Sequence, residues 1–109
     1  MTHKLQYSPE ALRDLDEIEA YITEELHNPD AASHIVSRIL DAADRLESFP
    51  ESGALLSSIT GVPNDYRLVP VQHYLLFYRI LTQKVYIDRI LYGRRDYMRI
   101  LFDPQVKAD

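Results

Sequence analysis

The side chains in this sequence best suited to bind or stabilise charge are the arginines of its last third. Arg67, Arg79 and Arg89 each lie in a short apolar stretch typical of a strand, and the pair Arg94-Arg95 follows them. A guanidinium group is permanently charged and offers a planar fork of donors, which suits phosphate oxygens and equally the carboxylates of a protein partner. For any single arginine there is a simpler explanation: it lies on the exposed face of a sheet and has no binding role. In that case Arg79 or Arg89 would pair with Asp88 or with a carboxylate of a helix.

Arg67, Arg94 and Arg95 are candidates for a common site. Arg67 follows a loop, and Arg94 and Arg95 follow the end of the last predicted strand. If these strand ends converge, several guanidinium groups surround one patch. His73 begins a strand near Arg67 and is a candidate general base if its pKa stays near neutral. Tyr97 borders the arginines and could stack on a nucleic-acid base.

The charge of the chain is divided between its two parts. Residues 1–60 hold 4 Lys or Arg and 12 Asp or Glu, a net charge of −8, whereas residues 61–109 hold 8 and 5, a net charge of +3, which together give −5. We expect Asp14, Asp16 and Glu17 on a solvated helix face. An asymmetry of this kind indicates a charged partner more sharply than the total charge does.

Composition excludes several classes of site. There is no cysteine, and hydrophobic residues make up 46% of the 109 residues, which predicts one globular domain over residues 1–109. His3, His27 and His34 lack the spacing of metal ligands, so we expect neither a metal nor another cofactor. No apolar stretch is long enough for a signal peptide or a membrane span, and we expect a cytoplasmic protein without membrane contact.

Local signals predict the elements that position the arginines. Residues 4–7 suit a short strand, and Ser8 and then Asn28 suit the N-caps of two helices, each followed by proline at the first helical position. The first helix carries apolar residues at helical spacing: Leu12, Leu15, Ile18, Ile22 and Leu26. The stripe of the second runs from Ala32 to Phe49, and Pro50 stops it.

The second half of the chain predicts a sheet. Residues 51–64 are a loop with one short strand, residues 66–69, 74–81 and 85–92 are strands, residues 95–102 form a short closing helix, and residues 103–109 are a loose tail. The predicted fold class is α+β: an N-terminal strand and an antiparallel helical hairpin packed on one face of a twisted antiparallel sheet, with a short C-terminal helix.

Several short segments of the sequence, and the order in which they occur, resemble the RelE/ParE superfamily of toxins from type II toxin–antitoxin modules. The resemblance covers about residues 5–102 and rests on Tyr7-Ser8-Pro9-Glu10-Ala11-Leu12-Arg13-Asp14-Leu15, Leu46-Glu47-Ser48-Phe49-Pro50 followed by Gly53, Tyr66-Arg67-Leu68-Val69, Phe77-Tyr78-Arg79-Ile80, and Ile87-Asp88-Arg89-Ile90-Leu91-Tyr92-Gly93-Arg94-Arg95-Asp96. It implies a helical hairpin on a twisted antiparallel sheet, in agreement with the reading from local signals. It also implies a cognate antitoxin whose flexible segment wraps the toxin in a hetero-oligomer.

The superfamily has two activities, and the residues favour one of them. RelE-like members cleave mRNA on the ribosome. Arg67 and Arg95 match their catalytic arginines, which stabilise the charge that develops on the phosphate. In such an enzyme His73 or Tyr97 would assist proton transfer. The tyrosine beyond the second arginine of those enzymes falls here near Leu101, and residues 57–65 contain no basic residue. A net charge of −5 also opposes binding to RNA, because the phosphates of RNA are negatively charged.

The sequence is therefore identified as nearer ParE, whose members poison DNA gyrase through protein contacts. On this hypothesis the protein is a growth inhibitor of a plasmid-stabilisation system. Antitoxin carboxylates and apolar side chains would meet a surface that we predict from Tyr78, Arg79, Arg89, Arg94 and Arg95. The alternatives are a ribosome-dependent mRNA endoribonuclease and a degenerate, non-toxic binding module.

Overall fold

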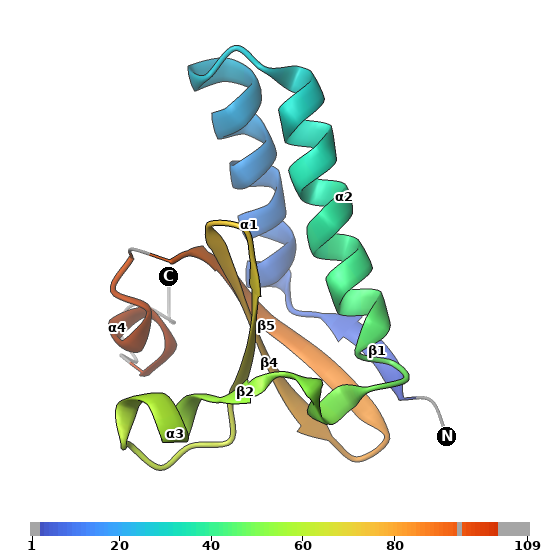
Figure 1. The fold of residues 1–109 in the computed structure, drawn as a ribbon, viewed down its shortest axis with the longest axis vertical. Helices are drawn as coiled ribbons and strands as arrows, with labels where there is room; N and C mark the ends of the chain where they lie inside the picture. Colours follow the sequence, from blue (N-terminus) through green and yellow to red (C-terminus); the bar gives the residue numbers. More distant parts are fainter. Residues whose placement is uncertain (1–2, 94, 103–109) are drawn as a thin grey trace.

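A five-stranded sheet forms the centre of the molecule in the computed structural model, which describes residues 3–93 and 95–102. The strand order is β1-β5-β4-β3-β2 (Figure 1). The strands are β1 (Lys4–Tyr7), β2 (Ala54–Leu55), β3 (Arg67–Val71), β4 (Tyr74–Leu81) and β5 (Lys84–Tyr92). Neighbours from β2 to β5 are antiparallel, whereas β1 joins β5 in parallel. Each predicted strand is present, and the short strand expected within the loop is β2.

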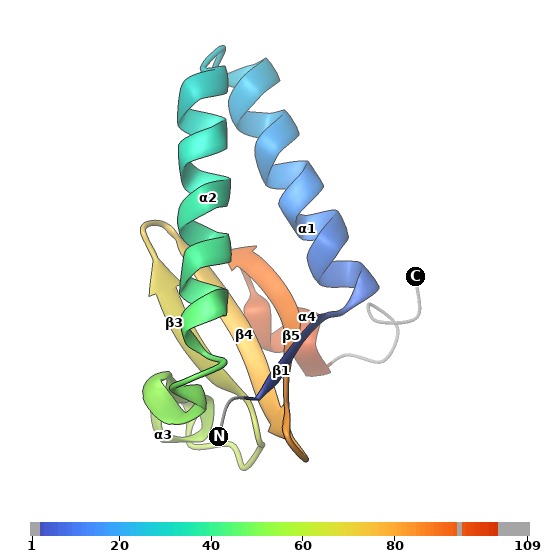
Figure 2. The same cartoon turned by 90° about the vertical axis from the view of Figure 1, so that its right-hand side faces the viewer.

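Two long helices form the predicted hairpin. They are α1 (Pro9–Ala20), which continues as the π-helix η1 (Tyr21–Glu25), and α2 (Pro29–Arg45). Both predicted caps are confirmed, since Ser8 accepts a hydrogen bond from the Ala11 N–H at 2.9 Å and Asn28 accepts one from the Ala31 N–H at 3.1 Å. The hairpin packs on one face of the sheet and extends past the ends of the strands (Figure 2).

The other face of the sheet carries the short helices. They are α3 (Leu56–Thr60), preceded by the 3-10 turn η2 (Pro50–Ser52), and α4 (Tyr97–Phe102). Leu56 of α3 and Leu101 of α4 pack there with Leu68, Phe77 and Leu91 of the strands. Figure 1 shows α4 and the hairpin on opposite sides of the sheet. The predicted closing helix is present on the face opposite the hairpin, and α3 was not predicted.

Three residues predicted on the apolar stripes are exposed instead. Leu12 is turned outward because Ala11 and Leu15 take the inward positions of α1. Leu26 lies where the hairpin has passed the end of the sheet. Phe49 is 68% exposed, because α2 ends at Arg45 and the chain leaves the helical register before reaching it.

Ser8 and Asp14 form hydrogen bonds with the backbone of β5 beyond the end of β1. Beyond Tyr7, the Ser8 N–H donates to the Ile87 carbonyl at 2.9 Å and the Ser8 hydroxyl donates to the Asp88 carbonyl at 2.6 Å. Further along the strand, the Ile90 N–H donates to the Asp14 carboxylate at 2.9 Å. The start of α1 thus satisfies backbone groups that a short edge strand would leave open.

Two kinds of site find no place in residues 3–93 and 95–102. None of the helices there has the length and apolar character needed to cross a membrane. The same residues contain no group of three or more His, Cys, Asp or Glu side chains that could hold a metal ion. The tail from residue 103, predicted to be loose, lies outside the described residues.

Candidate partner-binding groove

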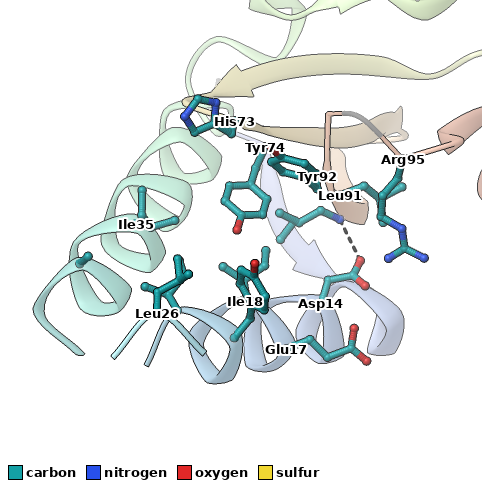
Figure 3. Close-up of a pocket in the computed structure, with 14 residues that line it drawn as sticks. Asp14, Glu17, Ile18, Leu26, Ile35, His73, Tyr74, Leu91, Tyr92 and Arg95 are labelled. Carbon is teal, nitrogen blue, oxygen red and sulfur yellow. Dashed lines mark hydrogen bonds between the residues drawn. The ribbon is translucent and has the colours of Figure 1, made fainter. Parts of the chain in front are cut away.

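A groove of about 610 Å³ lies where the hairpin projects beyond the sheet. Its walls are the end of α1, η1 and the start of α2 on one side, and the ends of β4 and β5 on the other. Figure 3 shows Ile18, Leu26 and Ile35 on the helices facing Tyr74 and Tyr92 on the strands. The groove exists because the helices are longer than the strands they cover.

The floor of the groove is apolar and aromatic. The rings of Tyr74 and Tyr92 meet edge to face, with centroids 5.8 Å apart, and His73 lies against Tyr92 at 6.4 Å. Burial, together with the nearby phenols of Tyr21 and Tyr92, raises the pKa of Tyr74, so its hydroxyl is neutral at physiological pH. Ten of the fourteen lining residues are aliphatic or aromatic, which is the composition expected of a site for apolar side chains.

One rim of the groove is built on a buried ion pair. Asp14 is only 4% exposed, so the prediction that it lies on a solvated face was wrong. Its carboxylate accepts hydrogen bonds from Arg89 Nε at 2.8 Å and Arg89 Nη2 at 2.9 Å, besides the one from the Ile90 N–H. The hydrogen bond to Asp14 raises the pKa of Arg89 against the opposing effect of burial. Arg89 is therefore held by a helix carboxylate, as one of the two sequence interpretations expected.

A β-bulge accounts for the direction of Arg89. Phe77 pairs with Arg89 and Tyr78 pairs with Ile87, which leaves Asp88 as an extra residue in β5. A bulge bends its strand and re-aims the neighbouring side chains. Arg89 thereby reaches α1.

Arg79 lies in a different environment, among aromatic rings. Its guanidinium carbon is 5.4 Å from the ring centroid of Tyr66 and 5.6 Å from that of Tyr86. Its Nε lies 3.7 Å from Asp88 Oδ2, an ion pair without a hydrogen bond between those two atoms. Burial and the hydrogen bond to Asp88 raise the pKa of Tyr66, which stays a neutral donor. Arg79 is thus paired with Asp88, again as the simpler interpretation expected.

A second recess, of about 370 Å³, lies beside Arg79 and Arg89. Its charged lining is balanced, with four arginines and four carboxylates: Arg13, Arg79, Arg89, Arg95, Glu10, Asp14, Glu17 and Asp88. Because the charges cancel within the recess, it favours neither an anion nor a cation.

Arg67 and Tyr78 together hold the loop that contains η2. Arg67 Nη1 donates to the carbonyls of Glu51 at 3.2 Å and Gly53 at 3.0 Å. The Tyr78 hydroxyl accepts a hydrogen bond from the Gly53 N–H at 2.9 Å and donates one to the Pro50 carbonyl at 2.7 Å. Tyr78 is fully buried. Both side chains therefore have structural contacts, and Tyr78 can influence a partner only through the loop that it holds.

The two arginines matched to catalytic positions are not brought together. Arg67 pairs across the sheet with Tyr78, which pairs with Ile87, whereas Arg95 comes after Tyr92. Five residues of strand separate those two levels, roughly 16 Å at a rise of 3.3 Å per residue. The expected convergence of Arg67 with Arg95 is therefore wrong.

The remaining predicted residues fall in three places. His73 and Arg95 both line the groove, at opposite ends in Figure 3. Tyr97 belongs to α4, and its ring packs on Phe77 with centroids 5.2 Å apart. Arg94 lies outside the described residues.

The sequence interpretation missed the groove itself. It concentrated on charged residues, whereas the lining is mainly apolar and comes from both halves of the chain. One signal was available: the apolar stripe of the hairpin runs on to Leu26, further than the short strands can cover. A stripe longer than its sheet predicts an apolar surface open to a partner.

A family model of a toxin matches most of the chain. Residues 5–97 match the family model described as ParE toxin of the type II toxin–antitoxin system parDE. A curated protein of Sinorhizobium fredii (strain NBRC 101917 / NGR234), named "Putative toxin Y4kP", is 48% identical over 50 residues. Those residues are 46% of this chain and 50% of that protein, so the match spans about half the length of each.

A solved structure shares the fold. It is titled "Chromosomal ParDE TA system from P. aeruginosa", and it superposes with a TM-score of 0.70 over 84% of this chain and 96% of that chain, at 22% sequence identity. At that identity the likeness extends to the arrangement of the helices and strands.

Proposed function

This chain belongs to the ParE family of toxins of type II toxin–antitoxin systems, and we propose that a cognate antitoxin neutralises it by docking in the groove between the hairpin and the sheet. The observation that carries the proposal is the groove's composition, an apolar and aromatic floor with Arg95 and His73 at its ends. A segment with apolar side chains and at least one carboxylate is complementary to it. Toxin and antitoxin would then form a hetero-oligomer in the cytoplasm, where both candidate targets lie.

Binding measurements test this docking site. The probe is the antitoxin encoded in the neighbouring reading frame, titrated calorimetrically into the purified full-length toxin. Tyr92→Ala removes a partly exposed ring from the groove and should weaken binding roughly tenfold or more, as for an interface anchor. Tyr86→Ala, on the same strand but outside the groove, is the control and should bind as the wild type does. Equal affinities for the two variants would rule the groove out.

For the target we propose DNA gyrase, reached through protein contacts. Two observations support this over RNA cleavage. Arg67 and Arg95 lie at different levels of the sheet, and Arg67 already donates to two backbone carbonyls. In addition, the net charge of −5 opposes binding to the phosphates of ribosomal RNA. Growth inhibition by such a toxin would select for plasmids or chromosomal segments that keep the antitoxin gene.

Two assays separate the target classes. Purified toxin should inhibit supercoiling of relaxed plasmid by gyrase, and induction of the toxin in cells should leave mRNA on translating ribosomes intact. The alternative, a ribosome-dependent endoribonuclease, requires new mRNA ends that disappear in Arg67→Ala. Observation of such ends would overturn the gyrase proposal. The third possibility, a binding module without toxicity, requires that induction without antitoxin leave growth unchanged.

A further inference from the structure

The first helix of the hairpin changes its geometry at the groove. α1 ends at Ala20, and residues 21–25 form the π-helix η1, in which the Leu26 N–H donates to the Tyr21 carbonyl, five residues back, at 3.3 Å. A π-helix is rare, and the wider turn is found frequently at functional sites. Here Tyr21, Ile22 and Leu26 all line the groove.

The π-helix decides which way Leu26 points. In a continuous α-helix, with 3.6 residues per turn, Leu26 would lie about 80° around the axis from Ile18, eight residues earlier. In the wider π turn each residue advances through a smaller angle, by roughly 15°, so that five residues remove most of that offset. Leu26 is thereby brought into line with Ile18 and Ile22, which face the core, and it reaches the groove (Figure 3).

The side chains that this turn directs to the groove remain exposed. Leu26 is 56% exposed and Tyr21 is 54% exposed, although both border an apolar floor. Leu12, on the same helical arm, is 51% exposed and does not line the groove. The chain therefore contains two leucines of almost equal exposure, of which one is presented to the groove.

The charges around the turn indicate what would cover it. Glu24 and Glu25 belong to the turn and are exposed, and Arg95 lies at the far side of the groove, also exposed. Glu17 of α1 is exposed and also lines the groove, so an occupant meets negative charge along the helical wall and positive charge beside Tyr92. An amphipathic helix with Lys or Arg along one flank of its apolar face and Asp or Glu along the other is complementary to this arrangement.

We propose that the π-helix is the recognition element of the groove, placing Tyr21 and Leu26 around an apolar side chain of such a helix in the antitoxin. This rests on the proposed function, because it takes the antitoxin as the occupant of the groove. It goes beyond that function by assigning recognition to a local change of helix geometry.

Leu26→Ala, with Leu12→Ala as the matched control, tests the contact. Both substitutions shorten an exposed leucine, so both variants should keep the thermal midpoint of the wild type. In calorimetric titrations with the antitoxin from the neighbouring reading frame, Leu26→Ala should bind roughly tenfold more weakly and Leu12→Ala within about twofold of the wild type. The same affinity for both variants would overturn the inference.

Insertion of one alanine after Glu24 tests the direction of Leu26. The insertion keeps every side chain of the turn and advances Leu26 by about 100° around the helix axis, away from Ile18 and the groove. It should weaken antitoxin binding as much as Leu26→Ala does. A folded insertion variant with wild-type affinity contradicts the inference. If the insertion prevents folding, the two leucine variants decide.

Different results would contradict the docking of the antitoxin in the groove and the role of the π-helix. If Tyr92→Ala weakens binding but Leu26→Ala does not, the antitoxin occupies the groove without using the π-helix, and the inference alone is wrong. If neither variant weakens binding, the groove is not the docking site, and both proposals fail.

Discussion

Asp14→Asn should be the most destabilising conservative substitution of a polar residue in α1. The change removes the charge opposite Arg89 while keeping the size of the side chain. Arg89 is left with 17% of its side chain exposed and no carboxylate in hydrogen-bond contact within the described residues. Breaking one partner of a buried pair costs about 3–5 kcal/mol, and an Asn oxygen in the place of Oδ2 can still accept two of the three hydrogen bonds, which puts the cost at the lower end. We expect a loss of about 3 kcal/mol in the free energy of unfolding.

Urea denaturation and thermal melting measure this loss. For a domain of about 100 residues, 3 kcal/mol corresponds to roughly 12–20 °C in the melting midpoint. Asp16→Asn, on the same helix and exposed, is the control and should change stability by less than about 0.5 kcal/mol. Replacing both Asp14 and Arg89 by leucine should cost less than the sum of the single Leu variants, because neither charge is then left alone. A cost below about 1 kcal/mol for Asp14→Asn, or strict additivity in the double variant, would refute the reasoning.

Three further predictions concern the tyrosines. Tyr78→Phe removes the two hydrogen bonds that the hydroxyl makes with the Gly53 N–H and the Pro50 carbonyl, and it should lower the free energy of unfolding by about 1–3 kcal/mol in urea titrations. Gly53→Ala should cost more than Tyr78→Phe in the same titrations, because a Cβ there would meet the Tyr78 hydroxyl oxygen at 2.5 Å; a smaller cost would show that the loop gives way. Burial, with Asp44 and Glu47 nearby, raises the pKa of Tyr7 from 10.0 to about 12. The unfolded chain therefore loses this proton at lower pH than the folded protein does, and the free energy of unfolding should fall between pH 10 and pH 12. If Tyr7→Phe shows the same fall of the free energy of unfolding with pH, Tyr7 is not its cause.

Local signals predicted most of the fold. Ser8 and Asn28 cap the helices, as their type and the following prolines indicated, and β4 has the predicted bounds. These features depend on neighbours in sequence, which is why they can be read without the structure. The parallel pairing of β1 with β5 joins residues about 80 positions apart, and no local pattern specifies it. Likewise α3 follows a two-residue strand in a stretch that contains turn residues, and its burial depends on Leu56 meeting the far face of the sheet.

The candidate site was harder to predict, because the sequence does not show whether a charged side chain has an ion-pair partner. Asp14 and Asp16 are two positions apart on one helix, yet only Asp14 faces β5 and becomes buried. The bulge at Asp88, which arises from the register of two strands, turns Arg89 toward it. Sequence could thus propose that an arginine and a helix carboxylate pair, but not which carboxylate, and not that the pair would leave the neighbouring groove largely apolar.

The pairing of the arginines alters what the positive charge of the second half can do. Arg67 binds two backbone carbonyls, Arg79 faces Asp88, and Arg89 is held by Asp14. Among the described residues, the Arg95 guanidinium has no hydrogen-bond or ion-pair partner, and it lies at the groove. Within residues 61–93 and 95–102, these paired arginines therefore do not form a continuous basic surface of the kind that RNA requires. Among the described residues, Arg95 is the arginine that lines the apolar groove, and Glu17 lines it too, an arrangement that suits one carboxylate on an apolar helix better than a phosphate backbone.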